Sequence, residues 1–102
     1  MRLRFLDQAK EDMVEIKQHY RKLGGASLAK KMIQQIKLPV LELEHNPEIA
    51  PPYEMSPGIH RLVVADGAFL AFYRTFNDMV DVIHIRRAER EPVTAAELEQ
   101  FV

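Results

Sequence analysis

Residues 58–90 constrain the fold most strongly, because three apolar runs follow one another there with only two short turns between them. Asp66 and Gly67 separate the first two runs, and this dipeptide accepts the positive φ angles of a tight hairpin turn. Asn77 and Asp78, which also favour turns, separate the second run from the third. The pattern predicts a three-stranded antiparallel meander with strands at residues 59–65, 68–76 and 80–86.

The middle run is apolar on both faces of the predicted strand, which is typical of a strand inside a sheet. Side chains alternate along a strand, so we also predict the two faces of the last run. One face should carry Val80, Val82, His84 and Arg86, and the other Ile83, Ile85 and Arg87. This arrangement would gather basic groups at one end of the sheet.

The chain before the meander predicts a short strand and two helices. Residues 2–6 alternate basic and apolar side chains, which suits a strand added to the meander. Asp7 is then the expected N-cap of a helix that ends at Gly24-Gly25, and Ser27 the expected N-cap of a second helix. The predicted buried stripes are Ala9, Met13, Ile16, Tyr20 and Leu23 in the first helix, and Ala29, Met32, Ile33, Ile36, Val40 and Leu43 in the second. The short connection favours an antiparallel helical hairpin.

Three further features complete the predicted fold. Pro39 lies within the second helix and predicts a kink or break near Lys37-Leu38. The proline-rich residues 47–57 predict an extended, stiff connection. A capping box from Thr94 to Glu97 predicts a short C-terminal helix. We therefore expect one α+β domain over residues 1–102, in which the helical hairpin packs on the sheet.

The net charge and the cysteine content restrict the classes of protein to which the chain can belong. The chain has 102 residues, a formal net charge of -1 and no cysteine. This charge argues against a strongly basic nucleic-acid-binding protein, and the lack of cysteine fits a reducing compartment. No signal peptide or membrane-spanning stretch is evident, so we expect a cytoplasmic protein that does not contact membranes.

The sequence favours no cofactor and no metal. The four histidines, His19, His45, His60 and His84, lack the spacing of metal ligands. Gly24-Gly25 lacks the Lys-Ser/Thr that follows a phosphate-binding loop, and neither Ser27 nor Ser56 has the setting of a catalytic nucleophile.

The chain resembles the ParE/RelE superfamily of type II toxin-antitoxin toxins. The likeness lies in Ala9 and Asp12, in the HNPEIAPPYE segment, in Pro57-Gly58-Ile59 before Arg61, and in the FYR and VDVIHIRRAER motifs. It is closest to the ParE branch, whose members poison DNA gyrase, whereas members of the RelE branch cut messenger RNA on the ribosome. The resemblance implies a toxin that is not itself an enzyme and that a cognate antitoxin neutralises.

Under this hypothesis, partner contacts come from arginines and from apolar groups near the C-terminus. The arginines would hold carboxylates of the antitoxin or of gyrase, and DNA would be contacted only through those proteins. The apolar groups, together with the second face of the sheet, would form an antitoxin groove. The candidate residues are Arg61, Arg74, Arg86, Arg87 and Arg90, with Leu98 and Phe101.

Two alternatives remain at this point. A RelE-like, metal-independent messenger-RNA endonuclease would need a proton-transfer group and cations at the scissile phosphate, for which His84 and Arg61 are the candidates. The other alternative is an inactive toxin relic that acts only in an autoregulatory complex with its antitoxin.

Overall fold

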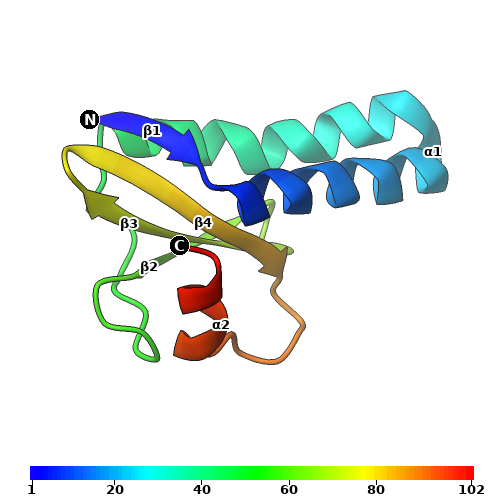
Figure 1. Cartoon of the computed structure of the whole chain (residues 1–102). Coiled ribbons are helices and arrows are strands. Elements are labelled where there is room, and N and C mark those ends of the chain that lie inside the picture. The colour runs from blue at the N-terminus through cyan, green and yellow to red at the C-terminus, as the bar shows by residue number, and fades with distance from the viewer.

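A computed structural model describes residues 1–102 and confirms the predicted α+β architecture. One four-stranded sheet lies between a long helical hairpin on one face and a short C-terminal helix on the other (Figure 1). The elements, in chain order, are β1 (Arg2–Phe5), α1 (Asp7–Leu41), the short 3-10 helix η1 (Glu42–Glu44), β2 (His60–Val64), β3 (Phe69–Phe76), β4 (Met79–Arg87) and α2 (Ala95–Gln100).

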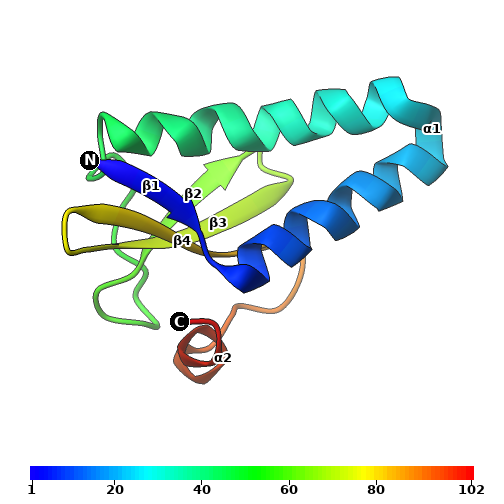
Figure 2. The same ribbon diagram turned by 45° about the horizontal axis from the view of Figure 1, so that its top comes forward.

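The sheet has the strand order β1-β4-β3-β2 (Figure 2). Strands β2, β3 and β4 form the predicted antiparallel meander, and β3 is an inner strand, as its two apolar faces indicated. The N-terminal strand β1 adds to the meander in parallel beside β4. Strand β4, the last strand of the meander, therefore lies between β1 and β3 and is an inner strand as well.

Both predicted turns lie where the sequence placed them. Asn77 and Asp78 have φ angles of 50° and 59° and join β3 to β4 directly. The turn between β2 and β3 is longer than a two-residue hairpin, because positive φ angles occur at Ala65, Asp66 and Gly67 and the strand pairing stops at Val64. Three consecutive residues share the reversal that Asp66-Gly67 alone was expected to make.

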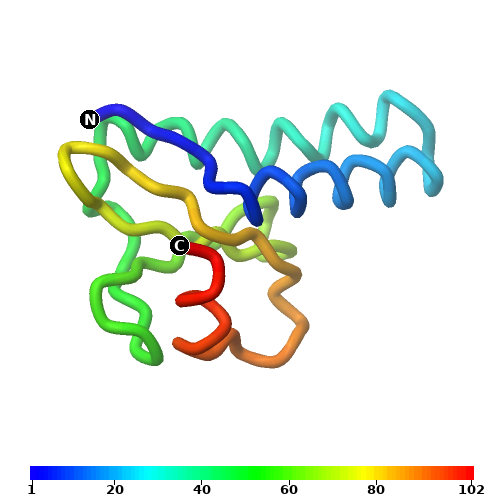
Figure 3. The backbone as a smooth tube through the Cα atoms, viewed as in Figure 1, coloured from blue at the N-terminus to red at the C-terminus, as the bar shows by residue number.

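The helical hairpin is confirmed, although its predicted caps are wrong. Gly24 (φ -148°) and Gly25 (φ 81°) are the non-helical residues inside α1, and they divide it into two halves that run back along each other (Figure 3). The N-cap is Leu6, with extended backbone angles and no side-chain bond, so Asp7 is instead the first helical residue. Helical geometry resumes directly after Gly25, which leaves Ser27 inside the second half and not at its cap.

Two predictions based on proline need correction. Helical angles continue through Pro39 to Leu41, so the helix does not break near Lys37-Leu38. Pro39 is exposed and lies close to the helix end, so the carbonyl that loses its amide partner there can bond to water. Residues 47–57 avoid a helix as expected, but they fold into successive turns and bends instead of extending. Backbone bonds such as Tyr53 N to Ile59 O, 2.7 Å, close this segment on itself.

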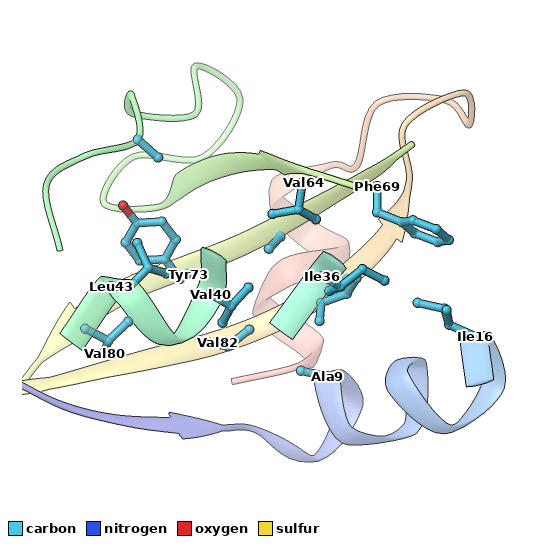
Figure 4. Close-up of a cluster of buried hydrophobic side chains, with 13 residues drawn as sticks. Ala9, Ile16, Ile36, Val40, Leu43, Val64, Phe69, Tyr73, Val80 and Val82 are labelled. Carbon is cyan, nitrogen blue, oxygen red and sulfur yellow. The ribbon is translucent and has the colours of Figure 1, made fainter. Parts of the chain in front are cut away.

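Two apolar clusters lie on opposite faces of the sheet. The larger cluster joins both halves of α1 to the sheet and includes Ile36, Val40, Phe69 and Tyr73 (Figure 4). The smaller cluster joins Phe72 and Ile83 to α2 and to the 47–57 segment through Tyr53, Ile59, Val93 and Leu98. Leu23 was predicted to join the buried stripe, but it is 68% exposed because it lies at the tip of the hairpin, beyond the sheet.

The C-terminal helix begins with the predicted capping box. The Thr94 hydroxyl accepts a hydrogen bond from Glu97 N at 3.1 Å, and the Glu97 carboxylate accepts one from Thr94 N at 3.3 Å. No helix in the structure combines the length and the apolar character needed to cross a membrane.

Candidate functional site

The open edge of β4 is closed by a carboxylate from α1. Strand β1 pairs with β4 only as far as Val82, so the backbone groups beyond that point have no neighbouring strand on that side. Asp12, which is buried, supplies the missing partner: its Oδ2 accepts a hydrogen bond from Ile85 N at 2.9 Å. The same oxygen lies 2.7 Å from Nδ1 of His84. Gln8 Nε2 donates to the other Asp12 oxygen at 2.9 Å, so the carboxylate is held on both sides.

A bulge in β4 turns His84 to its position beside Asp12. Phe72 pairs with His84 while Tyr73 pairs with Val82, so Ile83 has no partner residue on β3. Val80 and Val82 pack against α1, but His84 stacks on Phe72 at the opposite face. The prediction that Val80, Val82, His84 and Arg86 share one face is therefore wrong, because the extra residue resets the alternation. Ile85 and not His84 continues the α1-facing row.

Charged side chains gather in a cleft between the first half of α1 and the end of β4. The cleft has a volume of about 300 Å³. Its acidic members come from the helix, and its basic members come from both elements and from the segment just after β4. The ionisable lining residues are Asp12, Glu15, His19, His84, Arg86, Arg87 and Arg90. Such an arrangement can bind an anionic group at its cationic side.

The three arginines of the cleft differ in their exposure and in their contacts within the chain. Arg86 is only 8% exposed; its Nη1 donates to Glu97 Oε2 at 3.2 Å, and its Nε has no hydrogen-bond partner. The Thr94 backbone N–H and, more weakly, the Arg86 charge lower the pKa of the Glu97 carboxyl. Arg87 lies over the Phe69 ring, with 5.7 Å between its guanidinium carbon and the ring centroid, and Arg90 is exposed. Arg87 and Arg90 are thus the cations that a partner can reach.

Comparison with known proteins identifies the family. A model of the ParE toxin of the type II toxin-antitoxin system parDE matches residues 3–92. The chain belongs to the ParE toxin family. No curated protein sequence matches it.

Solved structures agree with the ParE assignment. A chain of the chromosomal ParDE toxin-antitoxin system from P. aeruginosa has 30% sequence identity and a TM-score of 0.78, over 87% of this chain and 97% of that one. The isolated E. coli RelE toxin has 20% identity and a TM-score of 0.60, over 99% and 98% of the two chains. The E. coli RelBE toxin-antitoxin complex contains a chain with 23% identity and a TM-score of 0.60, over 87% and 98%. The two RelE comparisons establish a shared fold.

The five arginines singled out in the sequence do not form one cluster in this ParE-family toxin. Arg74 lies at the end of the sheet away from the cleft. Its Nε is 3.3 Å from the buried Asp81 carboxylate there. Arg4 binds the same carboxylate at 2.6 Å. Arg61 lies on β2 over the Tyr53 ring, with 5.8 Å from its guanidinium carbon to the ring centroid. Only Arg86, Arg87 and Arg90 meet in the cleft.

The two apolar candidates near the C-terminus pack inside the chain. Leu98 is 2% exposed and belongs to the smaller cluster. Phe101 contacts His84, with 4.9 Å between ring centroids. These side chains cover the second face of the sheet, which was expected to be open for an antitoxin.

The alternative catalytic pair is separated by an aromatic ring. Arg61 pairs with Phe72 across β2 and β3, and Phe72 pairs with His84 across β3 and β4. Two strand spacings place the backbones of Arg61 and His84 roughly 10 Å apart. His84 is 7% exposed between Phe72, Phe101 and Asp12. Arg61 and His84 thus flank Phe72 on one face of the sheet, and no hydrogen bond links the two side chains.

Three residues of the cleft were missed at the sequence level: Asp12 as a buried anchor, Glu15 and His19. A signal for Asp12 was available, because it stands within the apolar helical pattern of Ala9, Met13 and Ile16. An acid at such a position needs a hydrogen-bonded partner when it is buried. No pattern marks Glu15 or His19. The structure contains no group of three or more His, Cys, Asp or Glu side chains that could hold a metal ion.

Proposed function

We propose that this ParE-family toxin acts in the bacterial cytoplasm, poisons DNA gyrase by protein-protein binding, and is neutralised by a cognate antitoxin. The observation that carries the proposal is the contrast within the cleft. Arg87 and Arg90 are accessible at its rim, whereas His84 is enclosed and bonded to Asp12. The reachable groups suit binding, and the group suited to proton transfer is shielded.

The accessible arginines favour a partner that presents carboxylates. A guanidinium offers donors in a planar fork that matches a carboxylate, and Arg87 is oriented by the Phe69 ring beneath it. The turn after β4, closed by the bond from Arg90 N to Arg87 O at 3.3 Å, places both residues in the same cleft. In this proposal Arg86 supports the cleft but does not bind the partner, because its Nη1 already donates a hydrogen bond to Glu97.

An antitoxin partner is supported by the relatives. The P. aeruginosa ParDE system and the E. coli RelBE complex are both toxin-antitoxin assemblies. We infer that the antitoxin hides the surface that meets gyrase, so toxin bound to antitoxin would not poison the enzyme. DNA contacts would then come through gyrase or the antitoxin, in keeping with the net charge of -1.

A gyrase cleavage assay tests the proposal. Purified toxin is incubated with gyrase, ATP and supercoiled plasmid, and the reaction is denatured and digested with protease before electrophoresis. Linear DNA that depends on the toxin is the expected result. The double variant Arg87→Glu/Arg90→Glu should lose this activity, whereas Lys22→Glu, an exposed charge reversal outside the cleft, should retain it.

Absence of linear DNA, with a working positive control, would contradict gyrase poisoning. A translation reaction would then test for messenger-RNA cleavage. If the chain is an endonuclease, the His84→Ala/Arg61→Ala variant should lose toxicity while still binding antitoxin. A folded protein that is harmless in both assays and on overexpression without antitoxin would be the inactive relic.

A further inference from the structure

A short segment of the chain lies along the outer edge of β2. Strand β2 pairs with β3 on one side only, and residues 51–53 lie along its other side. Arg61 N donates a hydrogen bond to Pro51 O at 3.2 Å. Tyr53 N donates one to Ile59 O at 2.7 Å. Residues 51–53, here called the proline strip, therefore cover the edge of β2 as far as Arg61.

Side chains and proline rings hold the proline strip in this position. Nδ1 of His60 lies 2.8 Å from Ala50 O, immediately before the strip. Tyr53, at the other end of the strip, is buried. The rings of Pro51 and Pro52 fix φ, and a residue before a proline favours an extended backbone. The strip therefore loses little conformational entropy when it docks on β2.

Beyond the proline strip the edge of β2 is open. Residues of an antiparallel strand direct their backbone N–H and C=O groups to alternate sides. Because Arg61 bonds outward to the strip, Val63 also points outward, whereas Leu62 faces Ala71 of β3. No hydrogen bond from a loop or turn reaches Val63, which is 53% exposed and lines a hollow of about 740 Å³. The edge is thus closed at Arg61 and accessible at Val63.

The proline strip offers no donor to a further strand. Pro51 O and Tyr53 N bond to β2, so the backbone nitrogen of Pro52 between them points away from the sheet. This nitrogen carries no hydrogen and cannot donate to an added strand. Proline at a sheet edge is one means by which proteins avoid edge-to-edge association.

We propose that the outer edge of β2 can pair with the same edge of a second copy, and that the proline strip keeps this surface closed. A twofold axis at Val63 would make the two edges antiparallel and place the two Val63 residues opposite each other. Arg61 of one copy would then lie opposite Ala65 of the other and beside its Asp66. Opposite charges would meet at both ends of the pair, so the edge complements itself. This inference does not depend on gyrase being the target.

The proline strip blocks this arrangement at both ends. A neighbouring strand lies about 4.8 Å away, so the residues opposite Arg61 would need the position that Pro51 occupies. While the strip is docked, only Val63 can pair. The few hydrogen bonds of one residue do not offset the loss of translational and rotational freedom when two copies associate.

The test compares the molar mass of variants of the full chain by light scattering after size-exclusion chromatography. Pro51→Ala/Pro52→Ala loosens the strip and restores the missing N–H groups. Its molar mass should rise with concentration to about twice that of the unmodified protein. The control Pro39→Ala/Pro57→Ala replaces two exposed prolines outside the strip and should leave the mass unchanged. Equal masses for the two double variants would overturn the proposal.

A charge on the edge separates strand pairing from association of a misfolded protein. Adding Val63→Lys to Pro51→Ala/Pro52→Ala should return the mass to that of the unmodified protein, because two like charges would lie opposite each other. Adding Val14→Lys instead should leave the association intact, since Val14 is 55% exposed but lies on α1. Association that persists with Val63→Lys, or that Val14→Lys abolishes equally, contradicts pairing through β2.

A single cysteine tests the register, because the chain contains none. Val63→Cys added to Pro51→Ala/Pro52→Ala should form a disulfide between copies under mild oxidation. Directly opposite residues that exchange hydrogen bonds have Cα atoms about 5.5 Å apart, a separation that a disulfide accepts. Leu23→Cys, at the exposed tip of the helical hairpin, should not form one. Equal cross-linking of the two cysteines would show that the copies meet elsewhere and would overturn the proposal.

Discussion

Oδ2 of Asp12 lies 2.7 Å from Nδ1 of His84, and the two residues are 72 positions apart in the sequence. The same oxygen receives the backbone N–H of Ile85, so one carboxylate from the helical hairpin completes the hydrogen bonding of β4 beyond the end of β1. Asp12 thereby ties the first helix to the strand that carries the arginines of the cleft.

The first prediction concerns this anchor. Asp12→Ala should lower the free energy of unfolding by about 2–3 kcal/mol, because it leaves a buried amide and an imidazole without their charged partner. Urea unfolding measures the loss, and hydrogen exchange at the Ile85 amide should accelerate. Glu11→Ala is the control, since Glu11 is an exposed neighbour on the same helix. Equal stability of the two variants would show that Asp12 does not anchor β4.

The second prediction is that the stability of the folded protein depends on pH through the carboxyl group of Asp81. Burial alone would raise the pKa of Asp81, but the hydrogen bonds and charges of Arg4 and Arg74 outweigh it and lower that pKa below its ordinary value of 3.8. A carboxyl group whose pKa is lower in the folded state than in the unfolded state stabilises the folded protein above pH 3.8. This stabilisation is lost as the pH falls toward the pKa of the folded state.

Asp81→Asn should therefore cost about 1 kcal/mol at neutral pH, a modest figure because the side chain of Arg4 is half exposed and water screens its charge. The difference from the unmodified protein should shrink as the pH falls below 3.8. Urea titrations across this range measure it, with Asp66→Asn in an exposed turn as the control. A difference that stays constant with pH would exclude the proposed ionic contribution.

The third prediction concerns the turn of the helical hairpin. Gly25 has φ 81° and ψ -173°, a combination that only glycine adopts readily. Gly25→Ala and Gly25→Asn should each destabilise the protein by about 1–3 kcal/mol, and asparagine should give no rescue because these angles are not left-handed helical. Thermal unfolding measures both variants. Full stability of either one would mean that the hairpin turns by another backbone route.

The fourth prediction compares two leucines. Leu98→Ala should destabilise the protein by about 2–4 kcal/mol because it opens a cavity beneath α2, whereas Leu23→Ala at the exposed hairpin tip should cost less than about 0.5 kcal/mol. Urea unfolding of the two variants gives the comparison directly. Similar losses would indicate that α2 is not closely packed on the sheet.

Local chemistry predicted much of the fold. Asn77-Asp78 and Gly24-Gly25 reverse the chain because few other residues accept the backbone angles found there. The capping box at Thr94 likewise needs only residues three positions apart. Such features depend on neighbours in the sequence, so they can be inferred without knowing where the rest of the chain lies.

The candidate site depended on longer-range contacts. The bulge at Ile83 moved His84 away from the row of Val80 and Val82, and the parallel addition of β1 left the edge of β4 open for Asp12. The register of β3 and β4 places Arg74 beside Asp81, at the opposite end of the sheet from Arg87. Alternation along a strand gives no information about register or about which distant element covers an edge.

The sequence by itself thus determined the turns, the helical hairpin, the meander and the C-terminal cap, because short-range backbone and side-chain preferences specify them. Only the tertiary structure decided which charges meet in the cleft between α1 and β4. That grouping depends on strand register, on the bulge and on the packing of α1, which bring together side chains that are far apart in the chain.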